Sequence, residues 1–269
     1  MIAGATGIRQ LSERVRASDA FPRLRGAGGA LADLLLPRVC VACERALATT
    51  DRGIVCGVCW TRLDAIPYPQ CTRCGHPHMR HSCKWCDLLP PFVRAVRSVC
   101  WVPGGAGGQI VHALKYEGWR ATAEGMSERM ARLSWPQDVI EERTALVPVP
   151  LSAGRLRERG FNQSELIARA LASRWRIPVW SDAVARARDT ETQTKLRPSD
   201  RLRNVAGAFD VSNAVSKRLR GTHLVLVDDV VTTAATLNAC AETLMNAGAR
   251  IISYVTFGRA RSASDRPLS

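Results

Sequence analysis

The amino-acid sequence predicts an α/β protein, a parallel sheet with helices on both faces, preceded by a small metal-stapled module. After His223, residues 224–227 form a short, uniformly apolar run, which is typical of a strand buried on both faces of a parallel sheet. Strand-like and helix-like segments alternate from about residue 95 onward. Eight of the ten cysteines lie before residue 90, in four Cys-x-x-Cys pairs.

The composition is that of a globular protein with a large excess of basic residues. The chain has 269 residues, is 46% hydrophobic and 23% charged, and carries a formal net charge of +14. This excess favours polyanionic partners or anionic substrates, and a solvated basic surface is equally compatible with it. No apolar run approaches the roughly 20 residues of a membrane span, and no apolar signal segment precedes Ala30. We therefore expect a cytoplasmic protein.

The cysteine pairs predict zinc. In a chain without a secretory signal, repeated pairs of this spacing are zinc ligands far more often than disulfides. The gaps of 12 residues after the first pair and 8 after the third suit two consecutive four-cysteine ribbons with two structural Zn²⁺ sites. An interleaved ligand pairing is left open. The predicted ligands are Cys40, Cys43, Cys56, Cys59, Cys71, Cys74, Cys83 and Cys86.

The remaining cysteines and the nearby histidines are expected to stand outside the ligand sets. Cys100 and Cys240 read as buried thiols. Because four cysteines already complete each site, we expect the histidines near the third and fourth pairs to lie on the surface or behind the ligands. These are His76, His78 and His81.

Composition shifts divide the chain into four parts. An Arg-, Gly- and Ala-rich arm covers residues 1–30, and the ribbon module covers 31–90, opening with a short helix that ends at Pro37. Pro90 and Pro91 form a stiff hinge, because consecutive prolines forbid helix. The sheet domain then covers residues 91–260, and a basic tail covers 261–269.

Periodicity gives the elements of the sheet domain in order. The strands are expected at 95–102, 144–150, 183–188, 206–211, 223–227 and 250–257. The helices are expected at 109–116, about 119–133, about 163–174 and 237–245, with a glycine-rich turn at 103–108. Between 188 and 206 the chain is polar and charged, as in the loops that close over active sites.

An acid pair followed by a small-residue loop marks a site for a phosphorylated sugar. Asp228 and Asp229 follow the predicted buried strand, and the loop at 232–236 leads into a helix. The carboxyl ends of parallel strands are where such sheets bind ligands. Loop N–H groups and a helix N-terminus bind phosphate, and the acids can accept hydrogen bonds from sugar hydroxyls or hold a divalent cation.

Two further groups of cations are candidates for the same site. Arg155, Arg157 and Arg159 precede a helix N-terminus, which makes an anion site, although a solvated charged surface is the alternative. Lys115 lies off the apolar face of its predicted helix and can reach a ligand, although a solvated lysine is more common.

Residues 224–236 resemble the 13-residue phosphoribosyl pyrophosphate (PRPP) motif of type I phosphoribosyltransferases. The resemblance implies that Asp228 and Asp229 bind the ribose hydroxyls, with Mg²⁺ accompanying PRPP. It also implies that the 5-phosphate is bound by Thr232, Thr233, Ala234, Ala235 and Thr236. The family usually has glycine at position 234. If that position requires a positive φ, alanine costs about 1 kcal/mol there.

The order of motifs along residues 35–260 resembles the ComF family. The four cysteine pairs are followed by His-Ala-Leu-Lys-Tyr, Val-Pro-Val-Pro, Arg-Gly-Phe-Asn-Gln and the PRPP motif. The resemblance implies a zinc ribbon joined to a type I phosphoribosyltransferase-like domain, and a link to natural transformation. It also implies that the hairpin within residues 181–210 is a catalytic loop, in which Thr190, Gln193, Arg201 and Asn204 match relatives.

These features support two classes of function. The first is transfer of a phosphoribosyl group from Mg·PRPP to a nitrogen nucleophile, or sensing of PRPP without chemistry. The three arginines would hold pyrophosphate, and Lys115 and Arg201 are the candidate catalytic residues. The alternative is a non-catalytic adaptor that binds single-stranded DNA through the ribbons and basic surface. Partners in either case include the proteins of a DNA-uptake machinery.

Overall fold

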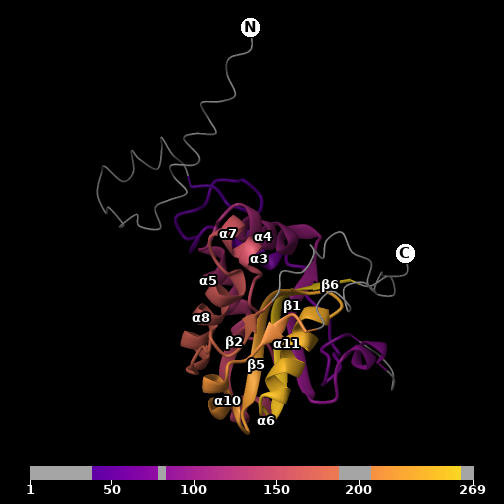
Figure 1. Cartoon of the computed structure of the whole chain (residues 1–269). Coiled ribbons are helices and arrows are strands. Elements are labelled where there is room, and N and C mark those ends of the chain that lie inside the picture. Colours follow the sequence, from indigo (N-terminus) through magenta and orange to yellow (C-terminus); the bar gives the residue numbers. More distant parts are fainter. Residues whose placement is uncertain (1–37, 78–82, 188–206, 262–269) are drawn as a thin grey trace.

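The computed structural model describes residues 38–77, 83–187 and 207–261 (Figure 1). Several expectations concern other parts of the chain and lie outside the described residues. These are the arm at 1–30, the short helix before Pro37, the tail after 261, and the residues His78, His81, Thr190, Gln193, Arg201 and Asn204.

A four-stranded parallel sheet forms the centre of the fold, as predicted. The strand order is β1-β6-β5-β2, and all three pairings are parallel. The strands are β1 (Val93–Val102), β2 (Arg143–Pro148), β5 (His223–Val231) and β6 (Ile251–Ala260). The strands expected on either side of the polar segment between 188 and 206 pair with each other. They form a short antiparallel pair, β3 (Ala185–Arg186) with β4 (Phe209–Asp210).

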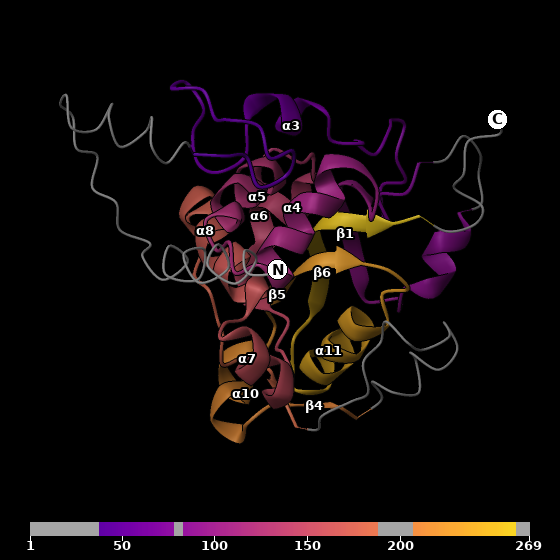
Figure 2. The same cartoon turned by 90° about the horizontal axis from the view of Figure 1, so that it is seen from above.

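Helices cover both faces of the sheet. Successive side chains of β5 point to opposite faces and so pack in two separate cores. Val225 and Val227 share a core with α4 (Gly105–Tyr116), α5 (Thr122–Ala131) and α8 (Gln163–Trp175). Leu224 and Leu226 share the other core with α10 (Asn213–Leu219) and α11 (Ala235–Asn246). Figure 2 shows α4 and α5 on one side of β1 and β6, and α11 on the other.

The cysteine-rich module packs on both faces and along the edge of the sheet. Cys40, Cys56 and Cys59 belong to the core on the α4 side, whereas Cys71 and Cys74 belong to the core on the α11 side. The module contains two short helices, α3 (Gly57–Thr61) and η1 (Lys84–Leu88).

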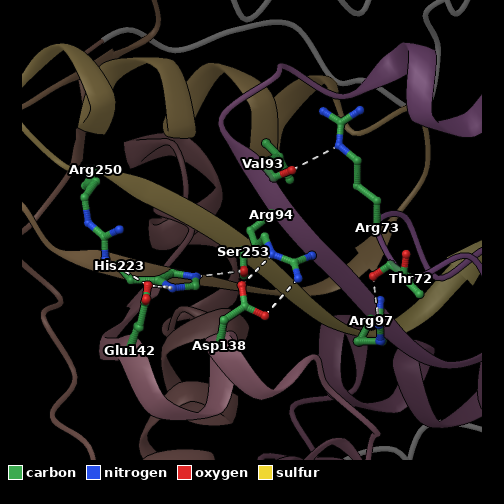
Figure 3. A network of polar contacts seen from close by, with 10 residues as sticks. All are labelled: Thr72, Arg73, Val93, Arg94, Arg97, Asp138, Glu142, His223, Arg250 and Ser253. Carbon is green, nitrogen blue, oxygen red and sulfur yellow. Dashed lines mark hydrogen bonds and ion pairs between the residues drawn. The ribbon is translucent and has the colours of Figure 1, made fainter.

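The outer edge of β1 is hydrogen-bonded to this module. Val96 N–H donates to the Arg73 carbonyl at 2.7 Å, and Trp101 N–H donates to the Asp64 carbonyl at 2.8 Å. In addition, Arg97 Nη2 donates to the Thr72 carbonyl at 2.9 Å (Figure 3). The ribbon module and the sheet therefore share one hydrogen-bonded boundary.

The structure corrects several boundaries. Residues 105–108 were expected in a turn, but α4 begins at Gly105. Helix propensity disfavours glycine, yet a Cβ at Gly108 would lie 1.6 Å from the Pro103 carbonyl oxygen, and one at Gly107 would lie 2.8 Å from Cys100 Sγ. Close packing therefore requires these glycines inside a helix. Three helices were not predicted: α6 (Gln137–Glu142), α7 (Ala153–Arg159) and α10. The strand expected at 223–227 continues to Val231, so Asp228 and Asp229 lie within β5 rather than after it.

Within the described residues, no helix is both long enough and apolar enough to cross a lipid bilayer.

Candidate functional site

A cavity of about 440 Å³ opens at the carboxyl end of β5. It lies where β5 gives way to α11, and α4 and α7 supply its other walls. Most of the residues predicted for the sugar-phosphate site line it, although they come from three segments of the chain. These are Lys115, Arg155, Arg159, Asp228, Asp229, Thr232, Ala234, Ala235 and Thr236.

The acid pair is held tightly at the floor of this cavity. Asp228 Oδ1 accepts hydrogen bonds from Ser164 Oγ at 2.8 Å and from the Asp229 N–H at 2.9 Å. Burial, reinforced by the neighbouring Asp229 carboxylate, raises the pKa of Asp228 to about 7. Two adjacent carboxyl groups with this electrostatic conflict favour a cation or a set of hydroxyl donors as their ligand.

Lys115 forms an ion pair with one of these acids. Its Nζ lies 2.8 Å from Asp229 Oδ2, and the two side chains are 21% and 4% exposed. Burial would lower the pKa of Lys115, but Asp229 and Asp228 together outweigh that effect and raise it. Lys115 therefore stays protonated, and its ion pair holds the Asp229 side chain in place.

The acid pair is suited to a hard divalent cation. Carboxylate oxygens are ligands that Mg²⁺ prefers, and Mg²⁺ is usually held by one or two carboxylates together with substrate phosphates. Lys115 engages one oxygen of Asp229, so Asp228 and the other oxygen of Asp229 are the groups that would face Mg²⁺ or the ribose hydroxyls.

The loop after β5 has the form of a phosphate cradle. Thr232, Ala234, Ala235 and Thr236 line the cavity, and α11 begins at Ala235. Thr233 does not line it, and its buried Oγ1 has no hydrogen-bond partner among the described residues. Ala234 adopts φ 60° and ψ 6°, the left-handed conformation that glycine occupies without strain.

Replacing Ala234 with glycine is expected to stabilise the protein by about 1 kcal/mol, because the left-handed conformation costs a residue with a Cβ roughly that amount. Urea unfolding measures the change. Ala235→Gly is the matched control: Ala235 is the first helical residue of α11, so glycine there should destabilise by about 0.5–1 kcal/mol. Equal effects of the two changes would contradict the interpretation.

The predicted arginine group lies on a short helix rather than in a loop. Ser152 Oγ caps α7 by accepting from the Arg155 N–H, and Gly160 ends the helix at φ 75°. Arg155 and Arg159 line the cavity, whereas Arg157 is exposed and does not. A helix brings i and i+4 to one face and turns i+2 away, which separates Arg157 from the other two.

Two residues of the site were missed in the sequence. Ser164, in the first turn of α8, is bonded to Asp228 across 64 residues, and no sequence signal links them. Tyr116 lines the cavity with 62% exposure, and the Arg159 guanidinium lies 5.6 Å from its ring centroid. Its place directly after Lys115 was the available signal.

The eight paired cysteines form two separate clusters in consecutive order. Cys40, Cys43, Cys56 and Cys59 form the first, and Cys71, Cys74, Cys83 and Cys86 form the second; in each, all Sγ atoms lie within 4.8 Å of one another. The structure therefore favours consecutive over interleaved pairing.

The geometry of these clusters fits zinc. All ten cysteines are free thiols, and the closest Sγ–Sγ separations, such as 3.3 Å for Cys74–Cys83 and 3.8 Å for Cys43–Cys56, are too long for disulfides. Around Zn²⁺, with Zn–S bonds near 2.3 Å, tetrahedral sulfurs stand about 3.8 Å apart.

Backbone N–H groups favour the thiolate form of one cysteine in each cluster. Burial would raise the pKa of Cys71, but N–H groups of Cys74 and Arg73 outweigh it and lower the pKa to about 6. In the first cluster, burial is likewise outweighed by the N–H groups of Cys56 and Ala42, and the pKa of Cys40 falls to about 7. One thiol of each cluster is therefore ready to bind a metal near neutral pH.

Fold and site together define a zinc-ribbon protein with a phosphoribosyltransferase domain. Residues 31–89 match the double zinc ribbon domain, and residues 162–267 match the phosphoribosyl transferase domain. The chain belongs to the ComF family, whose relatives here are named DNA utilization protein YhgH, competence protein F and competence protein ComFC. The family predicted from the order of motifs is confirmed.

Three relatives show the extent of the similarity. DNA utilization protein YhgH of Escherichia coli strain K12 is 35% identical over 230 residues, which cover 81% of this chain and 96% of the relative. Competence protein F of Haemophilus influenzae is 30% identical over 235 residues, covering 82% and 96%. Competence protein ComFC of Bacillus subtilis strain 168 is 27% identical over 201 residues, covering 72% and 79%.

Proposed function

We propose that this protein binds Mg·PRPP in the cavity at the end of β5 and transfers its phosphoribosyl group to a nitrogen nucleophile. One observation carries the proposal: a buried acid pair and a loop that opens a helix face the same cavity. The acids suit the vicinal hydroxyls of a ribose, and the loop suits its 5-phosphate.

Each group has a distinct role in this proposal. Asp228 and Asp229 accept hydrogen bonds from the ribose hydroxyls. The loop at 232–236 holds the 5-phosphate with its N–H groups and with the hydroxyls of Thr232 and Thr236. Arg155 and Arg159 face the pyrophosphate from α7. Bound Mg²⁺ would neutralise part of the charge of the pyrophosphate.

Transfer then depends on positioning and charge. The bond between the anomeric carbon and the pyrophosphate oxygen breaks with its electron pair on pyrophosphate. The nitrogen–carbon bond forms, and the nitrogen proton passes to solvent. The anomeric carbon is cationic in the transition state, so a nearby carboxylate pair stabilises it. Lys115 contributes by fixing Asp229 at 2.8 Å, and Arg201 remains a candidate from the loop outside the described residues.

The double substitution Asp228→Asn with Asp229→Asn is expected to abolish Mg-dependent, saturable binding of PRPP, because amides cannot provide the anionic acceptors. Calorimetric titration measures it. The matched control removes two exposed acids elsewhere, Glu124→Gln with Glu141→Gln, and should bind as the unsubstituted chain does. Equal binding by the acid-pair variant would sink the assignment.

We propose further that this activity serves the use or uptake of DNA, in agreement with the relatives' names, DNA utilization protein and competence protein. The net charge of +14 supports contact with a polyanion. Titrating single-stranded DNA in place of PRPP addresses the alternative, a non-catalytic adaptor. Tight, salt-sensitive DNA binding without any PRPP binding would favour the adaptor.

A further inference from the structure

We infer that Asn238 is a positioning residue that connects the second zinc cluster to the phosphate loop, so that zinc there sets the affinity for the phosphoribosyl ligand. The inference rests on the proposed function of the loop. It concerns how that loop is held, and which part of the chain holds it.

The phosphate loop needs external support. Ala234 holds a left-handed conformation without being glycine, and such strain persists only where surrounding contacts fix the backbone. The first turn of α11 supplies one of these contacts: the Asn238 N–H donates to the Ala234 carbonyl at 2.8 Å. Whatever fixes Asn238 therefore fixes the strained residue.

The side chain of Asn238 is held at both ends. Its Nδ2 donates to the Leu88 carbonyl at 2.7 Å, and its Oδ1 accepts from the Tyr254 hydroxyl at 3.0 Å. Tyr254 is fully buried on β6. The amide thus joins the first turn of α11 to the sheet on one side and to η1, in the ribbon module, on the other.

The position of Leu88 depends on the second cluster. Leu88 ends η1, two residues after the ligand Cys86, and Cys83 is the residue before η1. A 3₁₀-helix of five residues does not hold its shape unaided. Around it, Arg73 donates to the carbonyls of Cys86 at 3.3 Å and Pro90 at 2.7 Å.

Arg73 extends the same support to the sheet. It also donates to the Val93 carbonyl at 3.1 Å (Figure 3) and to the Leu89 carbonyl at 3.1 Å. Arg73 lies between the ligands Cys71 and Cys74, and one of its acceptors is the carbonyl of the ligand Cys86. A metal in the second cluster therefore fixes both the donor Arg73 and the segment that accepts its hydrogen bonds. Loss of zinc would release the Leu88 carbonyl from Asn238.

The first cluster offers an internal control, because it lies on the opposite face of the sheet. Its cysteines pack in the core with α4, α5 and α8, and that core contains no residue of α11 among those described. The second cluster shares its core with Leu237, Cys240 and Ala241 of α11. Coupling to the phosphate loop is therefore expected from the second cluster only.

Asn238→Asp tests the role directly. Aspartate still accepts from Tyr254 but cannot donate to the Leu88 carbonyl, so Mg·PRPP should bind about fivefold more weakly or worse. Asn246→Asp is the matched control, since Asn246 is exposed at the other end of α11, and should leave the affinity unchanged. Both variants should keep two zinc ions per chain.

A double-mutant cycle separates positioning from general stability. If Asn238 acts by holding Ala234, the loss should shrink to less than twofold in an Ala234→Gly background, where the left-handed conformation is unstrained. An affinity loss of the same size in both backgrounds, or none from Asn238→Asp, would overturn the inference. Absence of binding by the unsubstituted chain would overturn the proposed function and this inference together.

A third experiment replaces one zinc ligand in each cluster and compares the two variants. Cys86→Ser and Cys43→Ser should each lower the zinc content to one ion per chain, but only Cys86→Ser should weaken PRPP binding. Equal weakening by both changes would contradict a specific role of the second cluster. If Cys86→Ser fails to fold, the Asn238 cycle still decides.

Discussion

Replacing Cys74 with serine is expected to remove one zinc ion per chain and to lower the melting temperature by more than 10 °C. Cys74 is 1% exposed, and its carbonyl accepts a hydrogen bond from the buried Arg259 at 2.6 Å. Structural zinc contributes about 10 kcal/mol or more to small metal-stapled units, and a change of 1 kcal/mol shifts the melting temperature by about 2–4 °C in a domain of this size.

Metal analysis together with thermal unfolding checks this expectation. Ser98→Ala is a suitable control. Ser98 is buried like Cys74 but lies in β1, and its hydroxyl is hydrogen-bonded to the Thr256 hydroxyl across the sheet. It should keep both metals and lose far less stability. A Cys74→Ser protein that retained two zinc ions, or that melted within a few degrees of the unsubstituted chain, would show that the cluster is not a structural zinc site.

Replacing Lys115 with methionine is expected to destabilise the protein by about 3 kcal/mol at pH 8, because it leaves the buried Asp229 carboxylate without its cation. The loss should be smaller at pH 5.5. The pKa of Asp228, ordinarily 3.8, is about 7 in the folded protein, so the folded state binds more protons between these values. The free energy of unfolding therefore falls as the pH rises through that window. Because Lys115 lowers the pKa of Asp228, removing Lys115 makes this fall continue to higher pH.

Urea unfolding at the two pH values measures this effect. Adding Asp229→Asn to Lys115→Met should restore a large part of the lost stability at pH 8, because the amide needs no counter-charge. Lys217→Met, at an exposed position of α10, should change little. Additive losses from the two substitutions at 115 and 229 would argue against their coupling.

Patterns of short range predicted much of this fold. The apolar run in β5 indicated a strand with two buried faces, and its residues do point alternately into both cores. The Cys-x-x-Cys spacing predicted two metal clusters because a knuckle is a local structure. The caps of α7 are also local signals, because Ser152 and Gly160 mark its two ends. A helix predicted from them would have placed Arg157 on the face opposite Arg155 and Arg159.

The parts that could not be predicted depend on contacts between distant segments. Ser164 meets Asp228, and Lys115 meets Asp229, only once α8 and α4 have packed beside β5. The glycines of α4 look like a turn until the close approach of Pro103 is known. The backbone of Ala234 likewise became definite only in the folded chain.

The sheet domain depends on the ribbon module to cover the outer edge of β1. Val96 and Trp101 bond to ribbon carbonyls along the edge of β1 that is not paired with β6. A chain that began at residue 91 would present that edge to solvent, and an open edge recruits strands from other molecules. The ribbon module therefore keeps this edge of β1 from being open to strands of other molecules.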